Sequence, residues 1–245
     1  MTSYKPMSDK PSVRSPWFWV PSLYFAQGIP YVAVMIVSVL MYKRLGVSNT
    51  DIALYTSWLN LPWVIKPFWS PFVDLLKTKR WWVVTMQLLI GAGLAGVAFT
   101  IPTTFFFQAS LAVFWLLAFS SATHDIAADG FYMLALDSHE QAFFVGIRST
   151  FYRIAIIAGQ GVLVMFAGFL ENSTGNIPLA WSVTFFILGG LFLALFLYHR
   201  YILPLPKGDK PSATVTPSTI LKEFFATFAS FSVSYTHLTL PTICS

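Results

Sequence analysis

The chain has 245 residues, of which 56% are hydrophobic and only 10% are charged, and its formal net charge is +5. Soluble domains carry about 25% charged residues, so this composition excludes an ordinary soluble domain and indicates a protein with several membrane spans. Basic residues of such proteins gather in cytoplasmic loops, so the net charge does not indicate nucleic-acid binding, and no nucleic-acid partner is expected.

Six apolar stretches follow one another along the chain. Each exceeds the roughly 20 residues that a helix needs to cross hydrocarbon. Backbone groups cannot stay unpaired in lipid, so we expect six helices and an all-α membrane protein embedded in the bilayer. The stretches are 17–41, 52–72, 81–101, 105–136, 143–170 and 181–203, which together give a six-span bundle at 17–203.

The flanking residues predict the orientation. Residues 1–16 read as a cytoplasmic N-terminus, and residues 204–220 read as a polar, Pro-containing cytoplasmic linker. With the N-terminus inside, most basic residues between spans lie on the cytoplasmic side, and only Lys43 and Arg44 lie outside. This bias predicts a cytoplasmic N-terminus. The cytoplasmic residues are Lys5, Lys10, Arg14, Lys77, Lys79, Arg80, Arg200, Lys207, Lys210 and Lys222.

The last part of the chain changes character twice. Residues 221–232 are apolar and read as the start of a seventh span. The tail at 233–245, VSYTHLTLPTICS, resembles the translation of a sequencing adapter, so we expect the natural chain to differ from this point. The alternative is a short natural terminus. The single cysteine, Cys244, excludes a disulfide framework.

The first apolar stretch contains Gln27-Gly28-Ile29-Pro30 near its middle. Gly28 and Pro30 predict a helix break, and interrupted helices are good indicators of transporter binding sites. Gln27 would contribute an amide to a substrate site there. Tyr24 and Tyr31 stand three before and four after it, so all three residues can share one face. The alternative is a proline kink tolerated between packed helices.

An acid followed by basic residues ends the second stretch. Ser70 and Asp74 precede Lys77 and Arg80. Such an arrangement predicts a cytoplasmic gate closed by an ion pair. The alternative is a solvated loop that only sets the topology.

The third stretch, in contrast, has no charge and carries small residues spaced for close helix packing.

Ionisable residues lie inside three of the expected spans. Asp125 and Asp129 are one helical turn apart in the fourth stretch and share a face. Lys66 lies in the second stretch, and Arg148 and Arg153 lie in the fifth. Charge within hydrocarbon is costly and usually faces a polar pathway, which indicates transport. Two close carboxylates cannot both ionise easily, so the pair is a candidate proton carrier.

Depth along the spans predicts how these charges pair. At about 1.5 Å per residue, Asp125 lies at the depth of Arg153, and Asp129 lies at the depth of Lys66 or Arg148. The alternative is that basic neighbours neutralise both acids purely for packing. His124 and Asp129 point to different faces, and no catalytic motif is present, so no metal, cofactor or enzyme activity is expected.

Four segments carry a resemblance to a known family. They are YFAQGIPYV, VIKPFWSPFVD, SSATHDIAADGF and STFYRIAIIAGQG. With them the chain resembles the major facilitator superfamily, in the branch of AmpG-type muropeptide permeases and acetyl-CoA transporters. Two positions depart from the family pattern: His124 replaces an expected Gln, and Ser70 replaces a Gly. The motif positions are held by Gly28, Pro30, Lys66, Trp69, Ser70, Pro71, Asp74, Asp125, Asp129 and Arg153.

The resemblance implies a proton-coupled secondary transporter of the inner membrane. It implies a small-molecule substrate, best guessed as a muropeptide imported for cell-wall recycling, with protons as the coupling partner. The family has about twelve spans in two halves, so a C-terminal half would be missing from this chain. The alternatives are another solute, such as a siderophore or an acyl-CoA, and a non-transporting receptor or scaffold with the same fold.

Overall fold

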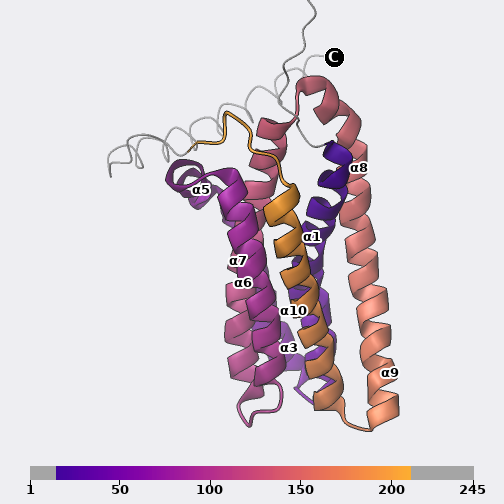
Figure 1. The fold of residues 1–245 in the computed structure, drawn as a ribbon. Helices are drawn as coiled ribbons and strands as arrows, with labels where there is room; N and C mark the ends of the chain where they lie inside the picture. The colour runs from indigo at the N-terminus through magenta and orange to yellow at the C-terminus, as the bar shows by residue number, and fades with distance from the viewer. Residues whose placement is uncertain (1–14, 211–245) are drawn as a thin grey trace, which may run out of the picture.

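The computed structural model describes residues 15–210, which are built from helices and short connections. Figure 1 shows a bundle in which the chain runs back and forth along one long axis. Within the described part, five helical stretches are long and apolar enough to cross a membrane: Pro16–Arg44, Lys79–Thr100, Phe106–Ala135, Ser138–Thr174 and Ile177–Ile202. The expected all-α membrane protein is confirmed. The predictions for residues 1–14 and 211–245, including the seventh-span start and the tail, lie outside the described residues.

The first stretch forms one helical rod with an irregular turn. It contains a 3-10 turn η1 (Pro16–Phe18), α1 (Val20–Val32), a π-helical turn η2 (Ala33–Val37) and α2 (Ser38–Arg44). The expected helix break at Gly28 and Pro30 is therefore wrong, because α1 runs through both residues and the irregular turn lies after them. Gly28 instead permits close packing. A Cβ atom there would lie 2.7 Å from Ala155 Cβ and 2.9 Å from the Tyr152 carbonyl oxygen.

The second stretch is not the single helix that we expected. It is divided into α3 (Asn49–Thr56), η3 (Ser57–Asn60), α4 (Leu61–Val64), η4 (Lys66–Phe68) and α5 (Ser70–Leu76). Pro62, Pro67 and Pro71 explain the division, because proline removes a backbone donor and clashes with the preceding turn. The pieces still run the length of the bundle, from α3 near one end to α5 at the other (Figure 1). They pack along α7. Whether they cross the membrane stays a prediction.

Two long helices pack on α6 (Lys79–Thr100), namely α7 (Phe106–Ala135) and α10 (Ile177–Ile202). Small residues allow α10 to pack closely on α6, as the small residues of the third stretch predict. A Cβ atom on Gly189 would lie 3.0 Å from the Gly91 carbonyl oxygen and 3.1 Å from the Ala95 nitrogen. Substituents larger than hydrogen would push these helices apart.

The fifth stretch lies at the edge of the bundle. It runs through α8 (Ser138–Ala158), a π-helical turn η5 (Gly159–Leu163) and α9 (Val164–Thr174). A capping box begins it: the Asp137 side chain accepts from the Glu140 N–H, and the Glu140 side chain accepts from the Asp137 N–H. Its main packing partner is α1. One face of α8 and α9 is therefore left exposed.

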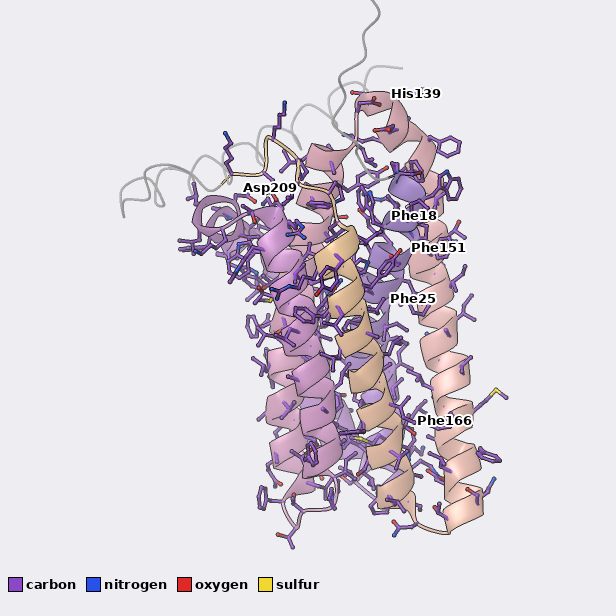
Figure 2. The ribbon with its side chains drawn as sticks, in the orientation of Figure 1. Phe18, Phe25, His139, Phe151, Phe166 and Asp209 are labelled. Carbon is purple, nitrogen blue, oxygen red and sulfur yellow. The ribbon has the colours of Figure 1, made fainter. Side chains whose placement is uncertain are left out.

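A polar cluster marks one end of the bundle. There the Asp209 carboxylate accepts the backbone N–H groups of Lys79 and Arg80 at 2.6 and 3.0 Å, which ties the linker to the start of α6. Figure 2 labels Asp209, Phe18 and His139 toward this end. The start of the N-terminal helix and the linker thus lie at the same end of the bundle (Figure 2).

Candidate functional site

Asp125 belongs to a buried ion pair in the middle of the bundle. Its Oδ2 atom accepts from Lys66 Nζ at 2.6 Å and from Trp63 Nε1 at 3.1 Å. The Asp125 residue is only 6% exposed, and its Oδ1 atom has no hydrogen-bond partner among the described residues. A carboxylate so far from water depends on its cation.

The expected pairing of Asp125 with Arg153 is therefore wrong. The irregular backbone between α4 and α5 brings Lys66 against α7, so Lys66 reaches Asp125 first. Residues 52–72 are not one straight helix, because the prolines divide them, so a constant rise of about 1.5 Å per residue misplaces Lys66.

Asp129 belongs to a second, more open cluster. Its Oδ1 atom accepts from the Tyr24 hydroxyl at 3.0 Å and lies 3.5 Å from Arg148 Nη1. Arg148 also donates to the Tyr24 hydroxyl at 3.1 Å and stands over the rings of Tyr24 and Tyr132, 5.0 Å from each centroid. Of the two expected partners of Asp129, the structure places Arg148 beside it.

A polar cavity of about 400 Å³ opens beside this second cluster, between α1, α7 and α8. Figure 2 labels Phe25 on α1 and Phe151 on α8, two of the helices that form its walls. Polar or aromatic-hydroxyl side chains line it throughout: Tyr24, Gln27, Asp129, Arg148, Ser149, Tyr152 and Arg153. The structure thus brings Tyr24, Gln27, Asp129, Arg148 and Arg153 to one place.

Tyr31 lies elsewhere. Its ring packs edge-on against Trp63 at a centroid distance of 5.2 Å, and Trp63 is the indole that donates to Asp125. Tyr31 therefore supports the Lys66–Asp125 pair and is absent from the lining of the 400 Å³ cavity.

The expected gate residues are distributed over several contacts. Asp74 forms an ion pair with Lys79. Lys77 stands over the Trp81 ring at 5.9 Å, and Arg80 donates to the backbone oxygens of Leu203 and Arg200 at the end of α10. Ser70 begins α5. The gate itself stays a prediction, with Lys79 as the cation that reaches Asp74.

Sequence reasoning missed a buried polar chain that connects four helices. Gln87 on α6 lies between two histidines, with its Nε2 atom 3.1 Å from His124 Nε2 and its Oε1 atom 3.0 Å from His199 Nδ1. Ser22 Oγ on α1 lies 2.9 Å from His199 Nε2. Gln87 and both histidines are fully buried. A lone Gln in an otherwise apolar third stretch was the available signal.

A second missed cluster ties the opposite end of the bundle. Arg44 at the end of α2 donates to both carboxylate oxygens of Glu171, which is near the end of α9. Trp181 of α10 donates its indole N–H to the same carboxylate at 2.7 Å. Arg44, one of the two basic residues of this end, therefore also has a structural use.

Known proteins resemble this chain over most of its described length. It matches the BT1 family over residues 25–230. A putative transporter AmpG 4 of Rickettsia conorii is 29% identical over 186 residues, which cover 70% of this chain and 41% of the relative. The anhydromuropeptide permease of Escherichia coli is 28% identical over 153 residues, covering 59% of this chain and 30% of the permease. The chain spans less than half the length of these relatives. The family match covers well over half of the sequence, so this chain belongs to the BT1 family.

Proposed function

We propose that this chain forms the first half of a proton-coupled transporter of the inner membrane, which imports muropeptides for cell-wall recycling. The relatives with names of transporters and permeases support transport over enzyme activity. A second half, supplied by further sequence, would complete the pathway. Alternating access then needs one half to rock against the other around a site near mid-membrane.

One observation carries the proposal: Asp129 lies on the wall of a polar cavity and is held by Arg148 at 3.5 Å. A charge-assisted hydrogen bond is usually 2.7–2.9 Å, so this pair is loose. The Asp129 side chain is 49% exposed, which gives a proton access to it. Asp125, in contrast, is buried against Lys66 at 2.6 Å.

Competition for Arg148 would couple the proton to the substrate. An acidic group of the substrate that approaches Arg148 would draw the guanidinium away from Asp129. A carboxylate that loses its opposite charge binds a proton more readily. Proton and acidic substrate would then bind together, which is the requirement for symport.

The proposed orientation places the N-terminus in the cytoplasm. Basic residues gather at the end of the bundle that holds the linker and the start of α6, whereas Lys43 and Arg44 lie at the other end. The positive-inside rule assigns the basic end to the cytoplasm. Asp74 and Lys79 would then close the pathway on the cytoplasmic side.

Uptake of a labelled anhydromuropeptide tests this proposal. The full-length gene product would be reconstituted into vesicles with an imposed inward proton gradient. The proposal expects accumulation that collapses when a protonophore is added. Binding of the compound without uptake would instead favour a receptor or scaffold, and uptake of an acyl-CoA alone would assign another substrate.

A further inference from the structure

A cavity of about 500 Å³ lies between the start of α6, the end of α10 and the linker that follows α10. Arg80, Arg200 and Asp209 line it, and Figure 2 labels Asp209 at this end of the bundle. The Asp209 carboxylate already accepts two backbone N–H groups of α6. Arg200 is exposed, and within residues 15–210 its side chain forms no ion pair and no hydrogen bond. Two guanidiniums against one carboxylate leave the cavity wall with one net positive charge.

An apolar cavity adjoins this one along the two helices. Leu88 lines the first cavity and also a second cavity of about 400 Å³ between α6 and α10, whose other walls are Gly, Ala, Leu and Phe residues. From Trp81 in the first cavity to Ala95 in the second, α6 rises about 21 Å at ~1.5 Å per residue. The hydrocarbon of one leaflet is about 15 Å thick, half that of the bilayer. The two cavities together, named the α6–α10 groove, therefore run the depth of one leaflet.

The α6–α10 groove is open along its length. Phe186 and Leu193 line its apolar part and are 55% and 49% exposed. A Cβ atom on Gly190 would meet nothing within 4 Å, so free space reaches the backbone of α10 there. Trp81, beside the cationic part, is 43% exposed, and Trp side chains gather at the level of the head groups. The groove thus offers an apolar wall at the depth of acyl chains and a cation at the depth of head groups.

This combination matches the chemistry of one class of ligand. We propose that the α6–α10 groove binds an anionic phospholipid, with its phosphate at Arg200 and an acyl chain along Leu88 and Gly190. Basic pockets between membrane helices on the cytoplasmic side are typical sites for acidic head groups. A single phosphodiester balances the net charge of the cavity wall, whereas a zwitterionic lipid brings its own cation and leaves that charge unbalanced. The lipid would join α6, α10 and the linker whether or not the chain transports a solute.

Two lipids with equal chains test the site. Dioleoyl phosphatidylglycerol is anionic and dioleoyl phosphatidylcholine is zwitterionic, and native mass spectrometry of the full-length protein measures the affinity of each. We expect a preference of about fivefold for the anionic lipid, the effect of one basic residue near an acidic head group. Arg200→Gln should reduce the ratio to about one, and Arg200→Lys should retain most of it. Lys207→Gln is the matched control, because it removes the same charge from an exposed linker position outside the cavity lining and should leave the ratio unchanged.

Gly190→Phe tests the path of the acyl chain. The phenyl ring would occupy the apolar part of the groove, where a Cβ atom meets no neighbour, so folding should be retained and both lipids should bind more weakly. Glycerol 1-phosphate carries the head-group phosphate without acyl chains, and at the concentration of the lipid it should not displace the lipid. Displacement would assign the site to a free phosphate and overturn the lipid.

Several results would contradict the site. They are equal binding of both lipids by the parent protein, a preference unchanged in Arg200→Gln, an equal loss in Lys207→Gln, and full lipid affinity in Gly190→Phe. Binding of neither lipid would overturn the site too, and is the result expected if another part of the full-length protein covers the groove.

Discussion

Lys66 Nζ lies 2.6 Å from Asp125 Oδ2, and this pair joins the proline-divided second segment to the middle of α7. The Asp125 side chain is 9% exposed and the Lys66 side chain 28%. Removing one member of a buried pair costs about 3–5 kcal/mol, because the other charge is left unpaired in low dielectric.

A double-mutant cycle follows from this geometry. Lys66→Met and Asp125→Asn should each lower the thermal midpoint of the purified protein clearly. The combined variant should be more stable than the sum of the two losses predicts, because it leaves no unpaired charge. Additive losses would show that Lys66 and Asp125 do not depend on each other.

Gly28→Ala should destabilise the protein despite the better helix propensity of alanine. The new Cβ atom would lie 2.7 Å from Ala155 Cβ, and overpacking of this kind costs about 1–3 kcal/mol. Ala155→Gly in the same protein should recover part of the loss. The control is Gly168→Ala, where a Cβ atom meets nothing within 4 Å and stability should stay level or rise. A stabilised Gly28→Ala variant would mean that α1 and α8 are not this close. Thermal unfolding in detergent measures all four proteins.

Gln87→Met should destabilise the bundle strongly, because it leaves two fully buried histidines without their shared partner. Each unsatisfied buried group costs about 1–3 kcal/mol. Gln108→Met is the matched control, since Gln108 is exposed near the start of α7. Equal thermal midpoints for the two variants would contradict the buried hydrogen-bond chain that joins His124, Gln87 and His199.

Cysteine labelling tests the topology. In a protein with Cys244 replaced by Ser, Asn172→Cys and Lys207→Cys place single thiols near opposite ends of the bundle, both at exposed positions. An impermeant maleimide should label position 172 in intact cells and position 207 only after permeabilisation. Labelling of position 207 alone in intact cells would reverse this orientation, which is the result expected if residues 49–76 do not cross. Labelling of both positions in intact cells would mean that Ile177–Ile202 does not cross.

The sequence predicted the class of fold because hydropathy and length alone determine where helices can span lipid. It also gave Arg148 as one of two candidate partners of Asp129, beside Lys66, because Asp129 and Arg148 lie on regular helices whose depths can be counted. The pairing of Asp125 failed for the opposite reason. Three prolines divide residues 49–76, and the side-chain position of Lys66 then follows from tertiary packing rather than from helical spacing.

The structural roles of Gly28 and His199 could also not be predicted from the spacing of residues along the chain. Gly28 was predicted to break the helix, but its lack of a Cβ atom allows close contact with α8, and sequence spacing does not reveal that α8 is its partner. His199 stands near the end of a span, where a solvent-facing side chain is the usual expectation. Its contact with Gln87 buries it completely. Such contacts join residues more than 100 positions apart.

Asp129→Asn gives the most direct test of proton coupling through the Asp129–Arg148 pair. Asparagine mimics the protonated carboxyl and cannot release a proton. In vesicles containing the full-length protein, this variant should lose accumulation of labelled anhydromuropeptide against a gradient, while exchange of internal for external compound continues. Protein abundance measured in parallel controls for folding. Accumulation equal to that of the parent protein would contradict the account and make the Asp129–Arg148 pair structural.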